Sequence, residues 1–354
     1  MKNAVLTGVS ALPVLPDACE WRALAPHAAP RAAARVRRAG ALAYAALMRS
    51  GGITRAVPGF EATPFRLTGN DIIWVSLDGP DHPRVVLIDG AATGDVLALH
   101  TGTQISNCAS SETVGGCGFS VHMASKSAAR AILRLMHSSN PRGFGGLLNG
   151  QSLPFPLSHR ADSAHALAHA CAADDGAAFV HHAQRLLGVG SGLTPSGDDF
   201  VGGALFALRL IHVRNAGGAV NITANTAPDV IGSTSDSAYL EARASRWQQA
   251  ATQVVTHAAS RTHVISAALL ADLARGQSYA ALHDFAAAIA CGDAETAFTH
   301  ATALTSIGAS SGWDMLAGFM AALDGSASAL TSPLTLSPDI DTPHAITQSI
   351  HHLA

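Results

Sequence analysis

The sequence has little of what nucleic-acid-binding, membrane and disulfide-rich proteins depend on. Only 13% of its 354 residues are charged and the formal net charge is −3, so a basic surface for nucleic acid or an anionic membrane is not expected. No uninterrupted apolar run approaches the roughly 18 residues that a membrane span needs. The five cysteines are odd in number and widely spread, without a disulfide framework or a paired CxxC zinc pattern. These absences predict a cytoplasmic protein with neither nucleic acid nor membrane as a partner.

What is present predicts an α+β protein of two parts. Hydrophobic residues make up 48% of the chain, which is typical of a globular protein with a sizeable core. Short β-branched or aromatic runs separated by turn residues predict strands at 65–67, 72–77, 84–88, 96–100 and 104–106. Alanine- and arginine-rich segments predict helices at 26–49 and 124–137.

The second part of the chain is predicted to be almost entirely helical. Glycines and prolines between residues 140 and 157 predict a long loop, and a domain boundary is placed near residue 158. This gives a mixed N-terminal domain with a short-stranded sheet (1–158) and a helical domain (159–354). Helices are predicted at 163–173, 177–187, 195–214, 237–259, 264–275, 279–290, 294–305 and 311–323.

Residues 188–200 are the stretch with the greatest density of chemically useful groups. They combine four glycines and several hydroxyl residues with the adjacent carboxylates Asp198 and Asp199. Thr194 followed by Pro195 is typical of a helix start, because threonine can cap and proline suits the first helical position. The stretch follows a helical pattern and lacks the lysine of a P-loop, so a nucleotide-binding loop is not predicted.

A second copy of this motif lies 115 residues further along the chain. Residues 196–203 and 311–318 share Ser, Gly, Asp and Gly at identical offsets, and each copy has a glycine and a hydroxyl residue just upstream. Two helices therefore start with a Ser-Gly-x-Asp turn. Helix N-termini offer unpaired N–H groups and a partial positive charge, so two facing termini would hold an anion from both sides.

These patterns predict a set of site residues. The predicted anion-binding residues are Gly190, Gly192, Thr194, Ser196, Gly197, Ser310, Ser311 and Gly312. The predicted catalytic residues are Asp198, Asp199 and Asp314. The adjacent carboxylates of Asp198 and Asp199 also predict a Mg²⁺ site, because Mg²⁺ favours carboxylate and phosphate oxygens. A simpler interpretation is that Asp199 and Asp314 only cap their helices, since a carboxylate in the first turn suits the helix dipole.

The string from Gly190 to Phe200 resembles the signature of the AllH family. The resemblance extends to residues 310–314 and 266–270, and to the order of a β-containing part before a helical part, from about residue 60 onward. It implies a subunit of a bacterial oxamate carbamoyltransferase, working beside an FdrA-like (AllF) subunit and an AllG subunit. That enzyme uses phosphate to split oxalurate into oxamate and carbamoyl phosphate during allantoin and purine catabolism.

Two other functions are compatible with the sequence. The chain could be a non-catalytic scaffold whose glycine-rich helix starts dock a partner subunit, in which case the isolated chain would bind no small molecule. It could also be a stand-alone hydrolase of a small amide, which would turn over without other subunits.

Overall fold

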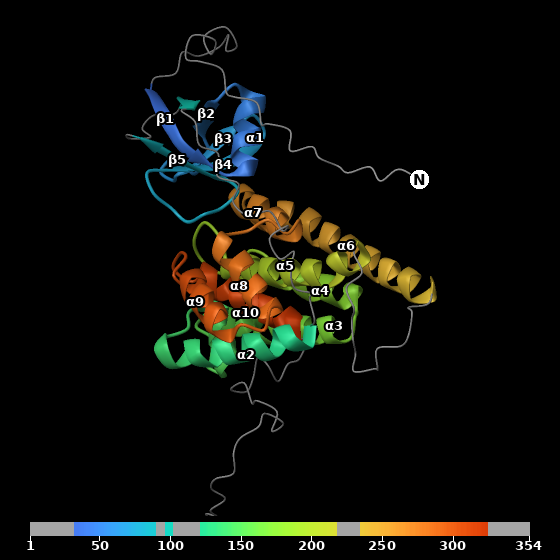
Figure 1. Ribbon diagram of the computed structural model, residues 1–354. Helices are drawn as coiled ribbons and strands as arrows, with labels where there is room; N and C mark the ends of the chain where they lie inside the picture. Colours follow the sequence, from blue (N-terminus) through green and yellow to red (C-terminus); the bar gives the residue numbers. More distant parts are fainter. Residues whose placement is uncertain (1–31, 90–95, 102–120, 218–233, 325–354) are drawn as a thin grey trace, which may run out of the picture.

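The computed structural model describes residues 32–89, 96–101, 121–217 and 234–324, and has the predicted α+β architecture (Figure 1). A small β-barrel comes first in the chain and a helical array follows it. The strands are β1 (Ala32–Ala39), β2 (Ile53–Ala56), β3 (Phe65–Thr68), β4 (Asp71–Ser76), β5 (Val85–Asp89) and β6 (Val96–Thr101), with helix α1 (Ala41–Ser50) after β1. The strand predicted at 104–106 lies outside the described residues.

The six strands close into a barrel with the order β1-β5-β4-β3-β2-β6. The β1–β6 and β4–β5 pairs are parallel, and the other four pairs are antiparallel. Side chains from the strands and from α1 form one buried apolar cluster, because alternate residues of a strand point to the same face. Its largest members are Tyr44, Leu47, Val36, Ile73, Val75, Val86, Ile88, Leu97 and Leu99.

The helix predicted at 26–49 is wrong over residues 32–39, and its first six residues, 26–31, lie outside the described part of the chain. Residues 32–39 form β1, and only 41–50 form a helix. Along β1 burial alternates, with Ala34 and Val36 buried and Arg35 and Arg37 exposed. The alanines favour a helix locally, but pairing with β5 on one side and β6 on the other satisfies the backbone and buries the apolar face.

Within the described residues the helical array contains nine α-helices, α2 to α10, and their bounds lie close to the predicted ones. Within the described residues, no helix is long and apolar enough to cross a membrane. The helices are α2 (Val121–Ser138), α3 (Ala161–Ala172), α4 (Gly176–Leu186), α5 (Ser196–Gly217), α6 (Thr234–Arg261), α7 (Val264–Ala274), α8 (Ala280–Ala290), α9 (Ala294–Thr305) and α10 (Ser311–Asp324).

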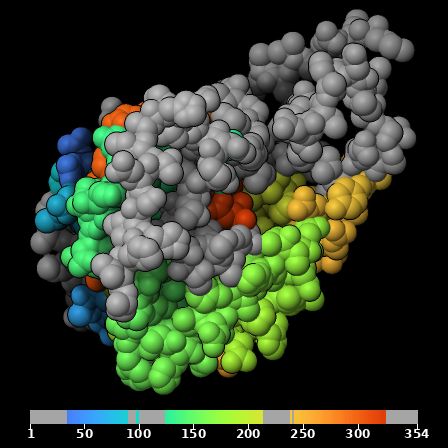
Figure 2. Space-filling model, turned by 90° about the horizontal axis from the view of Figure 1, so that it is seen from below, coloured from blue at the N-terminus to red at the C-terminus, as the bar shows by residue number. Residues whose placement is uncertain are grey.

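The segment predicted as a loop at 140–157 contains regular structure. It holds the 3₁₀ helix η3 (Gly143–Asn149), and a second one, η4 (Leu157–Arg160), begins at its end. Residues 144–148 are buried, so this segment is part of the core. Helix α2, which precedes the predicted domain boundary near residue 158, packs against α8 and α9, and the division into domains stays a prediction. Figure 2 views the side away from the barrel, where the green segments that follow the barrel form much of the surface.

The barrel touches the helical array at α7 and at the start of α8. Arg84 donates two hydrogen bonds to the buried carboxylate of Asp272, one of them at 2.8 Å. Beside this ion pair, an apolar cluster joins barrel residues to α7 and to Leu193 of the glycine-rich loop; its buried members are Val57, Phe65, Ile72, Ile265 and Leu269. The barrel thus supports the loop that carries the first copy of the motif.

Candidate functional site

Helices α5 and α10 cross in direct backbone contact, and the contact is reciprocal. A Cβ atom added to Gly203 would overlap the carbonyl oxygen of Met315, and one added to Gly318 would overlap the carbonyl oxygen of Phe200. Under the 115-residue repeat, positions 200 and 203 correspond to positions 315 and 318. The two copies are therefore related by an approximate two-fold arrangement, and only glycine allows the backbones to approach this closely.

The hydroxyl residues at the two helix starts pair across this arrangement. The Oγ1 atom of Thr194 lies 2.9 Å from the Oγ atom of Ser311, and the Oγ atoms of Ser196 and Ser310 lie 3.2 Å apart. In each pair, an upstream hydroxyl of one copy meets the first serine of the other copy's helix. Ser196 is buried, whereas the other three residues are partly exposed. The two predicted half-sites thus form one site.

Asp199 and Asp314 are buried at the base of this site. Burial raises the pKa of Asp199 well above its usual range and the charge of Asp314 raises it further, while the hydroxyls of Ser311 and Thr194 lower it. Burial raises the pKa of Asp314 to about 7, against the lowering effect of the Phe144 amide and two serine hydroxyls. The Oδ2 atom of each aspartate has no hydrogen-bond partner among the described residues. A buried acceptor without a partner costs free energy, so the pair is suited to receiving protons or a hydrogen-bond donor.

The contacts of the two aspartates differ from those of a helix cap. Asp175 and Asp293 are helix N-caps in this structure, because each accepts hydrogen bonds from two amides of the helix that follows it. The described contacts of Asp199 and Asp314 include no such bond to their own helix. Their pKa values are raised, whereas the pKa of Asp293 is lowered by its hydrogen bonds to Thr296.

The two-fold arrangement is broken by a third element, η3. The backbone amide of Phe144 donates a hydrogen bond to Oδ1 of Asp314 at 2.6 Å. Gly143 has a φ of +57°, and a Cβ atom there would overlap the Asp314 carboxylate. No described residue gives Asp199 a comparable amide donor. The sequence did not predict this contribution, because the glycines and prolines of 140–157 indicated a loop; the glycines at 143, 145 and 146 were the available signal.

Five backbone amides at the starts of α5 and α10 already have hydrogen-bond partners. Gly197 N donates to Val189 O at 2.8 Å, and in the second copy Gly312 N donates to Ile307 O at 3.1 Å. Asp198, Asp199 and Asp314 donate their amides within their own first turns. Gly190 packs against the amide of Ser196, and Gly192 borders open space with a φ of +102°. The donors that this site can offer a ligand are therefore mainly hydroxyl groups.

The contacts of Asp198 differ from those of Asp199 and Asp314, which are called the carboxyl pair from here on. Its Oδ1 atom accepts a hydrogen bond from Gly188 N at 2.7 Å. Its Oδ2 atom accepts hydrogen bonds from Thr262 Oγ1 at 2.5 Å and from Ser266 Oγ at 2.6 Å. These three bonds tie the glycine-rich loop to the end of α6 and the start of α7, so Asp198 positions the loop, and the catalytic role predicted for it stays a prediction.

The residues present do not fit the Mg²⁺ site predicted at Asp198 and Asp199. Mg²⁺ requires six oxygen ligands in near-octahedral geometry, and both oxygens of Asp198 are already engaged. Among the residues that the structure describes, no group of three or more His, Cys, Asp or Glu is arranged to hold a metal ion.

Replacing Asp198 with asparagine is expected to weaken the fold. An amide keeps the shape of the side chain but places a donor where the carboxylate accepts three hydrogen bonds, so the free energy of unfolding should fall by about 2 kcal/mol. Urea denaturation of the full chain measures this. Asp293→Asn, at an exposed helix cap, is the matched control and should cost about 1 kcal/mol or less. Equal losses in the two variants would contradict the positioning role.

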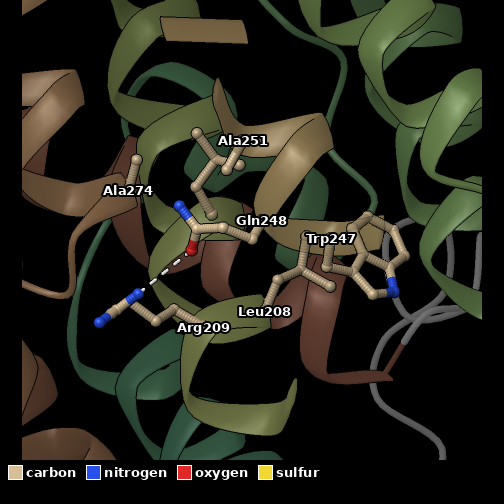
Figure 3. A pocket seen from close by; sticks show the side chains of 7 residues that line it. Leu208, Arg209, Trp247, Gln248, Ala251 and Ala274 are labelled. Atoms are coloured by element: carbon tan, nitrogen blue, oxygen red, sulfur yellow. Dashed lines mark hydrogen bonds between the residues drawn. The ribbon is translucent and has the colours of Figure 1, made fainter. Parts of the chain in front are cut away.

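Figure 3 shows a hollow elsewhere on α5. It is lined by residues of α5, α6 and α7, among them Leu208 and Trp247, and Arg209 hydrogen bonds to Gln248 across it at 3.4 Å. Leu208 lies nine residues beyond Asp199, about two and a half helical turns along α5. A neighbouring hollow of about 160 Å³ lies between α6 and α7. Neither is lined by a residue of the carboxyl pair.

The described geometry defines an α+β protein in which two equivalent helix starts bring together two buried aspartates and four hydroxyl residues. Comparison with known families gives a match: residues 186–246 and 229–323 are similar to the family model described as oxamate carbamoyltransferase subunit AllH. The matched region includes both copies of the motif and agrees with the predicted resemblance to the AllH family, but it covers less of the chain than that prediction, which began at about residue 60. The description is that of one subunit of a larger enzyme, which implies other subunits. Neither a curated protein nor a solved structure gives a significant match to the chain.

Proposed function

We propose that this chain binds the small substrate of an oxamate carbamoyltransferase in the site between α5 and α10. In the reaction, a phosphate oxygen attacks the carbamoyl carbon of oxalurate, and the products are oxamate and carbamoyl phosphate. The predicted partners are the FdrA-like (AllF) and AllG subunits, and the pathway is allantoin and purine catabolism. The observation that carries the proposal is the buried pair Asp199 and Asp314, each with an oxygen that has no described partner.

The chemistry of the substrate suits this pair. Oxalurate carries N–H groups, which can donate hydrogen bonds to the two Oδ2 atoms and relieve their lack of partners. Its carboxylate, or the attacking phosphate, can accept hydrogen bonds from Thr194, Ser310 and Ser311 at the partly exposed side of the site. The positive ends of two helix dipoles favour a negative charge in the same place. The amide nitrogen of oxalurate and the bound carboxylate or phosphate would thus be held at a fixed distance and orientation. A group-transfer reaction requires its reacting groups to be positioned in this way.

Reconstitution with the other subunits tests the reaction itself. We expect the assembly to release carbamoyl phosphate from oxalurate when phosphate is present, and not when this chain is left out. Release of ammonia by the isolated chain without phosphate would instead identify a stand-alone amide hydrolase. If the other subunits are active without this chain, the chain is a scaffold or a regulator and takes no part in catalysis.

Binding by the isolated chain tests the site. Calorimetry against oxamate and against phosphate, with and without Mg²⁺, should detect binding that Mg²⁺ does not enhance. Ser310→Ala should weaken it about tenfold, because each lost hydrogen bond to a charged ligand is worth about 1.5 kcal/mol. Ser260→Ala, on an exposed face of α6, is the matched control. Absence of any binding would favour the scaffold role, and unchanged binding in Ser310→Ala would remove this hydroxyl from the site.

A further inference from the structure

Two buried carboxyl groups within each other's electrostatic reach cannot both ionise easily. Asp199 is 6% exposed and Asp314 is 0% exposed, so little water is available to separate their charges. Each lies in the first turn of its helix, where the positive end of the helix dipole stabilises one negative charge. The arrangement therefore favours one shared negative charge and one proton.

The contacts decide which carboxyl group keeps the proton. Asp314 accepts the Phe144 amide at 2.6 Å, and this bond stabilises its ionised form. No described amide does the same for Asp199, although the repeat makes the two positions equivalent. We propose that the pair is a one-proton relay, in which Asp314 is the carboxylate that accepts a proton and Asp199 is the acid that donates one.

The reaction proposed above needs such a relay, and the role of the pair in catalysis rests on that proposed function. When the phosphate oxygen bonds to the carbamoyl carbon, the bond from that carbon to the oxamate nitrogen breaks. The nitrogen keeps the electron pair and gains a proton, while hydrogen phosphate loses one. Asp199 supplies the first proton and Asp314 takes up the second, so the charge of the pair is unchanged. The proton then returns from Asp314 to Asp199 for the next turnover.

Other groups near the pair fit this assignment. Burial of Tyr279, at the start of α8, raises its pKa, and the charge of Asp199 raises it further, so the tyrosine stays neutral. Asp198 is the other carboxylate that acts on Asp199, and it raises the pKa of that residue. The hydroxyls of Ser196, Ser310, Ser311 and Thr194 complete the surroundings of the pair and carry no charge.

Infrared spectroscopy of the full chain with ¹³C-labelled aspartate tests the relay without using activity. At pH 8, wild type should show a neutral-carboxyl C=O band that is missing from Asp199→Asn and unchanged in Asp293→Asn. In Asp314→Asn the band should remain but disappear at a lower pH, because the neighbouring charge is gone. Gly143→Ala, which pushes the Asp314 carboxylate from the Phe144 amide, should raise the pH at which Asp314 ionises.

Three results would overturn the relay: no such band in wild type, a band lost from Asp314→Asn instead, or loss of the wild-type band on adding Mg²⁺. An infrared pH titration of wild type alone gives a further test if a variant fails to fold. Above pH 6 the neutral-carboxyl absorption should decrease in two separate steps, one near pH 7 as Asp314 ionises and one at higher pH as Asp199 loses its proton. Loss of all the absorption in one step near pH 7 would contradict the assignment. A band with these properties in a chain whose assembly does not turn over oxalurate would refute only the proposed reaction.

Discussion

Gly318→Ala is expected to lower the free energy of unfolding by about 3 kcal/mol or more. The added Cβ would overlap the carbonyl oxygen of Phe200, and neither the atom nor its obstacle can move without shifting a helix. Overpacking usually costs about 1–3 kcal/mol, and a clash with backbone lies at the upper end or beyond. Chemical denaturation of the purified chain measures the loss. Because α5 and α10 carry both aspartates, we also expect the variant to lose ligand binding.

Two further variants separate this effect from the general cost of replacing glycine. Gly203→Ala meets the equivalent obstacle, the carbonyl oxygen of Met315, and should cost a similar amount. Gly176→Ala, at the start of α4, would place its Cβ at an ordinary 3.5 Å from the nearest atom. Since alanine favours a helix over glycine by up to about 1 kcal/mol, that variant should be neutral or stabilising. A Gly318→Ala chain as stable as wild type would mean that the two helices do not cross in this way.

Asp199→Asn is expected to reduce kcat of the reconstituted assembly by about 10²- to 10⁴-fold, the usual contribution of a general acid. Asparagine keeps the size of the side chain and its ability to hydrogen bond, but it has no proton to give to the leaving nitrogen. KM should change little, because the contacts with the bound substrate remain. Steady-state kinetics with oxalurate and phosphate measures both constants. Unaltered turnover in a folded variant would remove Asp199 from the mechanism.

The pH dependence of wild-type activity tests the roles of both aspartates. Activity should rise as pH increases through about 7, where Asp314 becomes a carboxylate, and fall at higher pH when Asp199 loses its proton. Asp314→Asn should lose the rising limb along with most of its activity. Asp293→Asn, an exposed capping residue that lies outside the site, serves as the control and should follow the wild-type profile.

The sequence predicted the helices well because their signals are local. Thr194-Pro195 starts α5 at Ser196, and the repeat predicted a matching start at Ser311, as the structure has it. The same repeat brought Asp199 and Asp314 into one predicted site. The strand at 32–39 could not be predicted in this way, because its alanines favour a helix and its pairing partners, β5 and β6, lie about 50 to 65 residues away in the chain.

The finer features of the site depend on contacts between distant segments. The sequence placed Asp198 and Asp199 together because they are adjacent, yet successive helical residues point in different directions. Asp198 therefore meets Thr262 and Ser266, while Asp199 meets the second copy of the motif. The amide of Phe144, which distinguishes Asp314 from Asp199, carries no side-chain signal. A backbone donor of this kind becomes visible only in the folded chain.

The crossing of α5 with α10 also sets the order in which the chain can assemble. At synthesis rates of about 5 to 20 residues per second, α10 follows α5 by roughly 6 to 23 seconds. Until α10 has been made, the surface of α5 around Gly203 lacks the helix that it meets in the folded chain. Contacts between the two helices must offset the entropy that is lost when the intervening segment closes into a loop. The pairing of Asp199 with Asp314 therefore depends on two segments 115 residues apart, and it forms only when α10 docks on α5.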